Sequence, residues 1–326
     1  SVGATPLAGA HSAIWGADAQ TIYVVGAAGE ILRLDSAGDV TPQTVPVTTT
    51  LNGVYGTGAG DIYAVGDSGV VLHSAGDGSW TALPAPADVD YMAVFAVGAD
   101  VFAVASSPTS GPYATLHGGI LVNSADAGQT WTQSTYGAYG HPGDSQRPSA
   151  FFAVSGTSAS DVYAVGGAHL GTQDSTIVYH FDGATWSPLA LAYDTLPWAQ
   201  YPAEAGHDFL SIWNGGSAGL FVGGVGEPFS NAGGIFSIVG GVATQEKVPL
   251  EDGADLIGVA PIQAIWGPSP STILAAAGAQ ILLRPSDGGP WCLAATAAGG
   301  VRSMWGPPGG NWFYALGNSI QKIQIQ

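Results

Sequence analysis

A short phrase recurs seven times in this chain of 326 residues, and it constrains the fold more than any other feature. It consists of a small residue, an aliphatic residue, an aromatic residue and usually a glycine, and a second strand-like phrase follows each copy. A period of about forty residues built from short β-type segments is typical of a stacked or radial repeat array. The copies begin at Ala13, Gly53, Ala93, Ala150, Ser211, Ala264 and Ser303.

Each repeat contains four segments of strand length separated by glycine-rich turns. In the second repeat these segments are 53–56, 62–66, 70–73 and 80–83, and β-branched or aromatic residues dominate the first three. Four antiparallel strands repeated around an axis form a β-propeller. The sequence therefore predicts an all-β fold, a single seven-bladed β-propeller of four-stranded antiparallel blades spanning residues 1–326.

The two ends of the chain predict how the ring closes. The seventh repeat has three strand segments after residue 301, and a short segment precedes the first repeat. An unpaired strand edge exposes backbone donors and acceptors, so closed rings avoid one. We expect the seventh blade to consist of 301–326 plus 1–9, with the N-terminal strand completing it.

Composition narrows the range of partners. Lys and Arg total 6 against 24 Asp and Glu, which gives a net charge of −18. Without a basic stripe to displace phosphate counterions, we expect no nucleic-acid partner. No apolar run approaches the length of a membrane span, so we expect no membrane insertion. A glycine-rich, lysine-poor β protein is typical of secreted, periplasmic or cell-surface proteins, and the one cysteine, Cys292, is expected to be a buried small hydrophobic residue.

One turn carries a recognisable signature. The segment Ser124–Trp131 reads S-x-D-x-G-x-T-W, and shorter variants occur at 77–80, 182–186 and 287–291. The chain thus resembles the bacterial Asp-box propellers, which include sialidases, glycan hydrolases, assembly factors and surface lectins. The resemblance implies that Asp126 stabilises a turn between the third and fourth strands and is not catalytic. The chain has only four arginines, mostly in strand-like positions, so the arginine triad of sialidases is not matched.

The lengths of the connections predict a working face. In a meander of four strands, the second–third loops and the blade-to-blade loops lie at the same end, and these are the connections that lengthen in repeats three to six. Long loops in a compact repeat fold usually carry function. The six long connections are 106–118, 167–175, 225–233, 134–149, 189–208 and 249–262.

The contents of these connections favour ligand recognition. Tyrosine and tryptophan present flat apolar faces with a polar edge, which suit sugar rings or an extended chain. We expect a carbohydrate or an extended polymer as ligand. The candidate ligand-binding residues are Tyr113, Tyr136, Tyr139, Trp198, Tyr201, Arg147, Asp174 and Glu204.

A histidine-dependent hydrolase or lyase is the alternative. Neutral imidazoles with a carboxylate suit Zn²⁺ or Cu²⁺, although no pair of histidines shows the usual ligand spacing. Without a metal, a histidine and a tyrosine could act as base and acid. His73 and His180 occupy equivalent third-strand positions and are expected to belong to the scaffold. The candidate metal ligands are His117, His141, His169 and His207, and the candidate catalytic residues are His141, His207, Tyr139 and Tyr201.

Overall fold

The computed structural model describes residues 4–6, 9–86, 89–106, 119–136, 150–170, 173–193, 207–226, 233–246, 248, 260–269, 271–285 and 289–325. This part of the chain is almost entirely β-structure. Two 3-10 turns, η1 (Ala27–Gly29) and η2 (Gly216–Ala218), are its only helical segments. Across these residues no helix has the length and apolar character needed to cross a bilayer.

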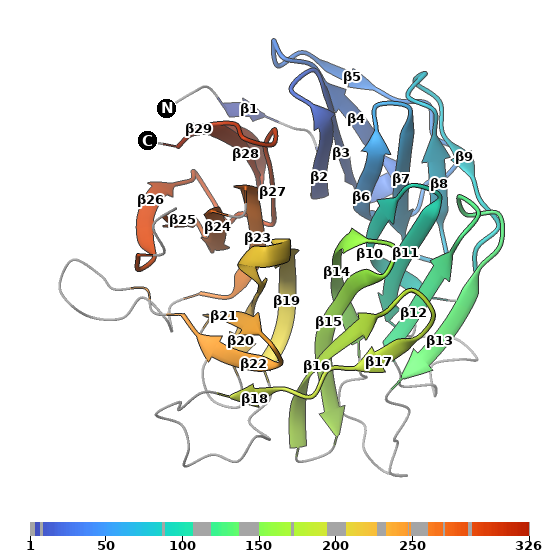
Figure 1. Cartoon of the computed structure of the whole chain (residues 1–326). Helices are drawn as coiled ribbons and strands as arrows, with labels where there is room; N and C mark the ends of the chain where they lie inside the picture. Colours follow the sequence, from blue (N-terminus) through green and yellow to red (C-terminus); the bar gives the residue numbers. More distant parts are fainter. Residues whose placement is uncertain are drawn as a thin grey trace.

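The strands form six sheets arranged around a central axis, with the first strand of each repeat innermost (Figure 1). Within each repeat, strands that follow one another in the chain pair antiparallel. The first sheet contains β2 (His11–Asp18), β3 (Thr21–Gly26), β4 (Ile31–Leu34) and β5 (Val40–Pro42). The second contains β6 (Leu51–Gly58), β7 (Asp61–Gly66), β8 (Val71–Ser74) and β9 (Thr81–Ala82).

The next sheet has eight strands because two repeats are joined. One set of four is β10 (Asp90–Val97), β11 (Asp100–Ser106), β12 (Gly119–Ser124) and β13 (Thr132–Tyr136). The other is β14 (Ala150–Ser158), β15 (Asp161–Leu170), β16 (Gln173–Phe181) and β17 (Trp186–Pro188). A single residue pair, Ser106 with Ala150, links β11 to β14.

Three further sheets complete the ring. One contains β19 (His207–Asn214), β20 (Leu220–Gly226), β21 (Gly233–Val239) and β22 (Val242–Gln245), with β18 (Ala192–Tyr193) added parallel to β22. The next contains β23 (Ile262–Ser269), β24 (Thr272–Ala277), β25 (Gln280–Arg284) and β26 (Cys292–Thr296). The last contains β27 (Ser303–Trp305), β28 (Trp312–Leu316), β29 (Ser319–Gln324) and β1 (Ala4–Pro6).

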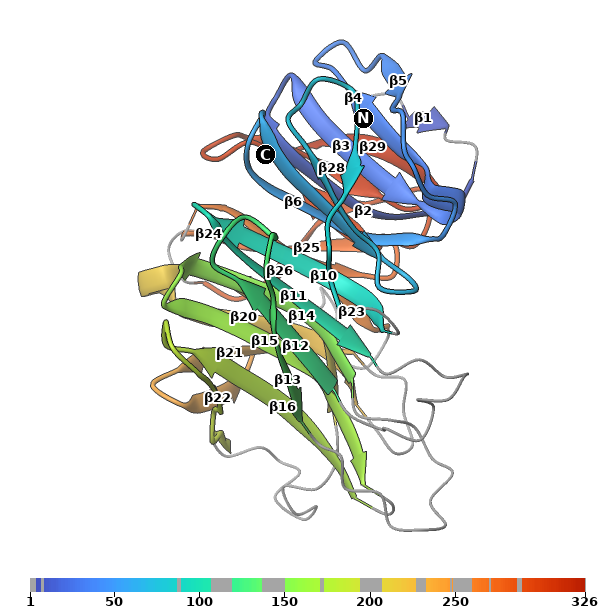
Figure 2. The ribbon, with the colours of Figure 1, turned by 90° about the vertical axis from the view of Figure 1, so that its right-hand side faces the viewer.

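The N-terminal strand lies where the ends of the sequence predict it. β1 pairs antiparallel with β29, with Ala4 opposite Gln321, so the first and last strands lie side by side (Figure 1). The last sheet therefore gains its fourth strand from the beginning of the chain, and β29 is not left as a free edge. Figure 2 shows the same sheets from the side, stacked face to face around the axis.

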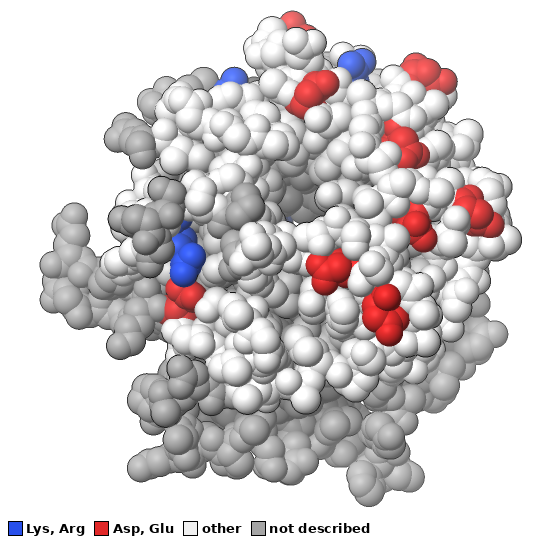
Figure 3. All heavy atoms as spheres, viewed as in Figure 1, with Lys and Arg blue, Asp and Glu red and all other residues white. Residues whose placement is uncertain are grey.

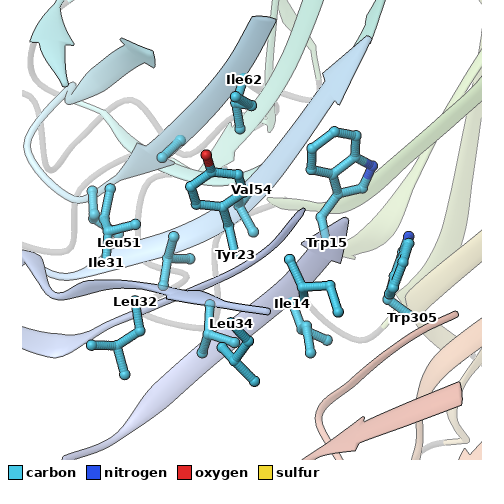
Figure 4. Close-up of a cluster of buried hydrophobic side chains, with 14 of the residues drawn as sticks. Ile14, Trp15, Tyr23, Ile31, Leu32, Leu34, Leu51, Val54, Ile62 and Trp305 are labelled. Carbon is cyan, nitrogen blue, oxygen red and sulfur yellow. The ribbon is translucent and has the colours of Figure 1, made fainter. Parts of the chain in front are cut away.

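The recurring aromatic and glycine pack against each other between neighbouring sheets. A Cβ placed on Gly16, Gly56, Gly156 or Gly267 would lie 2.7 Å from a ring carbon of Trp305, Trp15, Phe95 or Trp213 respectively. Gly306 lies in the same way against Trp266, at 2.9 Å. Each ring thus fills the space above the glycine of the next first strand, and the contact between Trp305 and Gly16 joins the last sheet to the first. Figure 4 shows Trp305 beside Ile14 in this cluster.

The fourth repeat is shifted relative to the sequence prediction. Ala153 pairs with Val165 as Ala13 pairs with Val25, so the repeat phrase begins at Ala153 and not at Ala150. Ser155 then stands where the other repeats have an aromatic residue. At the matching glycine position of the next first strand the chain has Asn214, whose backbone N–H donates to Ser155 Oγ at 3.1 Å. A polar contact therefore replaces the aromatic–glycine contact between β14 and β19.

Two of the predicted long loops and the predicted burial of Cys292 are corrected by the structure. Residues 167–175 mostly extend the hairpin of β15 and β16, because their backbone groups continue the ladder. Residues 189–193 run along the outer edge of β22, where β18 pairs, and do not rise above the ring. Cys292 is exposed because β26 is an outermost strand with solvent beyond it.

Candidate functional site

The innermost strands surround a cavity of about 210 Å³ on the axis of the ring. Its described walls come from the first strand of every repeat, so all of the sheets contribute to one site. The space-filling view is hollowed at this point (Figure 3). A central cavity formed by many strands is the usual place for a ligand in a closed β architecture.

In six of the seven first strands a β-bulge leaves one residue unpaired, and five of these residues lie at the mouth of the cavity. In β2 the ladder with β3 skips Ser12, and the same bulge recurs in five other first strands. A bulge re-aims a side chain, and bulges are frequent beside functional sites. The bulge residues are Ser12, Asn52, Met92, Phe152, Leu210 and Gln263, and Arg302 precedes Ser303 in the same position of the last repeat.

The cavity becomes less polar with depth. Six residues of the bulge layer line it and are half-buried or exposed: Ser12, Asn52, Met92, Leu210, Gln263 and Arg302. Two positions further along the strands lies a layer of aliphatic residues, all less than 9% exposed: Ile14, Val54, Val94, Ile212, Ile265 and Met304. The layer between consists of small residues, which leaves the axis open. A group that enters from the bulge end therefore passes a partly polar mouth before it reaches apolar walls.

The mouth is polar on one side and apolar on the other. Gln263, Arg302, Ser12 and Asn52 come from consecutive repeats across the chain ends and form a polar arc, whereas Met92 and Leu210 face it. Asn52 is fixed, because its Nδ2 donates to Asp67 Oδ1 at 2.7 Å and to the Tyr91 carbonyl at 2.9 Å.

Arg302 is the one charged residue among the described residues that line the cavity. Its Nη1 donates to the His11 carbonyl at 3.4 Å, and the guanidinium carries five N–H donors. Arg302 is exposed at the mouth, so donors remain for a ligand. Only six Lys and Arg residues occur in the whole chain, which makes the position of this one notable.

The bulge residues could not be recognised as a site from the sequence, because they share a position in the repeat and not a residue type. The signal was present: each member immediately precedes the small residue of the repeat phrase, apart from Phe152, whose repeat was read in the wrong register. The long connections attach at the same end of the sheets, because the start of β2 pairs with the end of β3 and the other repeats follow this pattern.

Tyr136 makes contacts within the scaffold. It ends β13 opposite Gly119, and its ring packs against Phe151 and Tyr179 at centroid distances of 6.5 and 4.5 Å. Its hydroxyl donates to the Trp186 carbonyl at 3.4 Å. The ring is partly buried by these contacts, and the assignment of Tyr136 as a ligand-binding residue stays a prediction.

Three other predicted residues are placed through their backbone. His169 and Asp174 are opposite each other in the hairpin of β15 and β16, and His207 begins β19 opposite Gly226. The two histidine-bearing strand ends are neighbours, because a Cβ on Gly167 would lie 3.4 Å from Asp208 Cα. The structure thus brings the backbone positions of His169 and His207 to the same end of the ring.

The remaining predicted site residues lie outside the described residues. Within the described part, no group of three or more His, Cys, Asp or Glu side chains could hold a metal ion. The metal and catalytic assignments therefore stay predictions. The residues outside the described part are Tyr113, His117, Tyr139, His141, Arg147, Trp198, Tyr201 and Glu204.

His73 and His180 occupy equivalent positions, as the sequence predicts. They pair with Tyr63 and Tyr163, and their Nε2 atoms lie 2.8 and 3.3 Å from Asp61 and Asp161 Oδ1. Burial alone would raise the pKa of Asp61, but hydrogen bonds from Thr57 and His73 lower it below its ordinary value. These contacts tie the first–second turn to the third strand, which is a structural role.

Asp126 acts as a turn stabiliser. Its Oδ1 accepts from the Thr130 and Gln129 backbone N–H groups at 2.8 and 3.0 Å, and its Oδ2 accepts from Thr130 Oγ1 at 2.6 Å. These hydrogen bonds, those of Thr130 foremost, lower the pKa of Asp126 to about 2. Trp131 Nε1 donates to the Gly128 carbonyl at 3.0 Å and closes the turn.

Comparison with known proteins identifies the fold. Neither a protein-family model nor a curated protein sequence matches the chain. Among solved structures, YCF48 from Cyanidioschyzon merolae is 13% identical, with a TM-score of 0.64, over 99% of this chain and 98% of its own. YCF48 has also been solved bound to D1 peptide, at 13% identity and a TM-score of 0.63, over 99% of this chain and 96% of that one.

Two further structures show the same likeness. The WD40 repeats of RRP9 are 11% identical, with a TM-score of 0.67, over 99% of this chain and 97% of theirs. The extracellular domain of a putative hybrid two-component system from B. thetaiotaomicron is 11% identical, with a TM-score of 0.66; the match covers 98% of this chain and 39% of that one. At these identities the likeness concerns the fold alone, and the chain has the fold of a β-propeller.

Proposed function

We propose that this protein is a binding propeller that recognises an extended polymer at the mouth of its central cavity, without chemical conversion. In this proposal the eight-stranded sheet counts as two blades, so the ring has seven. The ligand enters from the end of the ring where the bulge residues lie and where the long connections attach. As the sequence suggests, we further propose that the protein works outside the cytoplasm, as a secreted, periplasmic or cell-surface protein.

The graded chemistry of the cavity carries this proposal. Specific ligand sites combine apolar walls with a few placed polar groups, and the layers from Arg302 to Ile265 have this arrangement. In a regular strand, side chains alternate between the two faces of the sheet. The repeated bulge breaks this alternation, and bulge residues such as Ser12 and Gln263 line the cavity. A volume of about 210 Å³ holds on the order of seven waters, enough for one end or one side group of a larger ligand.

The lining favours a polypeptide-like polymer over a sugar. Sugar sites rely on flat aromatic faces, and no Trp or Tyr occurs among the described lining residues. The candidate stacking residues of the loops lie outside the described residues, so carbohydrate remains the second ligand class. The carboxamide of Gln263 can both donate to and accept from a peptide backbone, and Asn52, whose Nδ2 donors bind Asp67 and the Tyr91 carbonyl, can accept through its Oδ1. That YCF48 has been solved with a bound peptide shows that a propeller of similar shape can take such a ligand.

A plugged cavity tests the proposal. Ser12 is a half-buried bulge residue, so Ser12→Phe should fill the mouth without disturbing a ladder hydrogen bond. Gln133→Phe, on the exposed outer strand β13, is the matched control. Both proteins and the wild type are presented with a glycan array and a random hexapeptide library. We expect to find peptides that bind the wild type and the control but do not bind Ser12→Phe. Ligands that bind Ser12→Phe as tightly as the wild type would contradict the proposal, and so would the absence of any ligand in both collections.

A histidine-dependent hydrolase or lyase is the second candidate, and one observation favours it. The neighbouring ends of β15 and β19 carry His169 and His207, at the end of the ring where the cavity opens. Metal analysis of protein purified without a histidine tag tests the metal-dependent form. Stoichiometric Zn or Cu that is lost in His169→Ala would support this candidate, and substoichiometric metal would remove its metal-dependent form.

A further inference from the structure

We infer that the cavity recognises an aliphatic carboxylate, as at the C-terminus of a polypeptide that ends in an aliphatic residue. The inference rests on the proposed binding function and names the chemistry of the same site. It follows from the order in which an entering group meets the three layers of the wall.

The first step concerns charge at the mouth. Arg302 stands in the exposed bulge layer, and the described lining contains no carboxylate beside it. Among the described residues its guanidinium makes one hydrogen bond, a long one of 3.4 Å to the His11 carbonyl, so further N–H groups can bind a planar anion. The protein carries a net charge of −18, so a general attraction for anions is absent and any recognition of a carboxylate is local to this guanidinium.

The second step concerns the depth of the cavity. Ile14, Ile212, Ile265 and Met304 are 5, 8, 7 and 5% exposed, so the deeper wall is aliphatic and nearly closed to solvent. A charged group placed there would lose its hydration without a partner. An aliphatic side chain placed there would instead be removed from water, at about 25 cal/mol per Å² of apolar surface.

The third step joins the two layers. Arg302 immediately precedes β27, and Met304 lies two residues further on, so their backbones are on the order of 7 Å apart, because a strand rises about 3.3 Å per residue. The terminal carboxylate and the side-chain end of one aliphatic residue lie closer together than this, and the long side chain of Arg302 can cover the difference. A C-terminal residue can therefore hold its carboxylate at Arg302 and its side chain among the aliphatic residues at once. Gln263 and Asn52 then face the last peptide groups of the ligand.

Two hexapeptide libraries that differ only in a free C-terminal carboxylate or a carboxamide test the inference. Each is selected on wild type, Arg302→Gln and Lys322→Gln protein and read by mass spectrometry. Lys322→Gln removes the same charge from β29, where Lys322 stacks on Trp312 away from the cavity. We expect free-acid peptides with an aliphatic last residue on wild type and Lys322→Gln, and about 10- to 100-fold weaker binding after Arg302→Gln or amidation, since a charge-assisted hydrogen bond is lost.

The outcomes separate this inference from the proposed function. Peptides that are lost in Ser12→Phe but bind equally as acids and amides would leave the binding function standing and overturn the carboxylate. Equal loss in Arg302→Gln and Lys322→Gln would also overturn it, because the effect would be one of total charge. Calorimetry with N-acetyl-leucine distinguishes the sources: binding as tight as the peptide's assigns the site to free aliphatic acids, and weaker binding assigns it to polypeptide ends.

Discussion

The contact between Trp305 and Gly16 provides the sharpest test of how the ring is closed. A Cβ on Gly16 would lie 2.7 Å from two ring carbons of Trp305 and 3.0 Å from Ile22 Cγ1, and all of these atoms are side-chain atoms. Overpacking of this kind costs about 1–3 kcal/mol. Replacing glycine by alanine at an ordinary φ returns about 0.4–1 kcal/mol through the unfolded chain. Gly16→Ala should therefore lower the free energy of unfolding by about 1–2 kcal/mol.

A double-mutant cycle isolates the contact. Phenylalanine lacks the two ring carbons that Gly16→Ala would strike, so Trp305→Phe should relieve the clash although it costs stability by itself. We expect the double variant to be more stable than the sum of the single changes by about 1 kcal/mol or more. Gly58→Ala is the control, because its Cβ would meet nothing within 4 Å, and its unfolding free energy should stay within about 0.5 kcal/mol or rise.

Urea unfolding followed by tryptophan fluorescence and by circular dichroism measures these differences, and coincident curves justify a two-state treatment. With an m-value of about 3 kcal/mol/M, the Gly16→Ala midpoint should fall by roughly 0.3–0.7 M. Additive energies in the cycle, or a Gly16→Ala midpoint equal to that of Gly58→Ala, would refute the aromatic–glycine account of ring closure.

Three further outcomes are expected. Because the pKa of Asp126 is lowered to about 2, the stabilising effect of its carboxylate is present above about pH 4 and is lost as the pH falls toward 2. The thermal midpoint of Asp126→Asn should therefore fall less over that range than the midpoint of the wild type. Parallel curves of midpoint against pH would contradict this. Cys292 should react with one equivalent of maleimide in the folded protein, whereas a need for denaturant would place it inside. Deleting residues 1–8 removes β1 and frees the edge of β29, so the melting temperature should drop sharply; an unchanged value would exclude closure by β1.

The sequence by itself determined the repeating unit. Strand segments such as Asp61–Gly66 and the turn around Asp126 depend on local alternation, glycine positions and side chain-to-backbone hydrogen bonds within a few residues. The equivalence of His73 and His180 followed from the same local spacing. The pairing of β1 with β29 could be predicted because a ring leaves a single place for an unpaired strand.

Only the tertiary structure decided the register and the surroundings of these units. The local sequence allows the repeat phrase to begin at Ala150 or at Ala153, and the partners on β15 selected the second. Tyr136 resembles a ligand-binding tyrosine in sequence, but its ring packs against Phe151 and Tyr179, while Cys292 is exposed on the outermost strand β26. Five of the six bulge residues meet at one cavity only after all of the first strands share an axis, since their distances in space bear no relation to their distances along the chain.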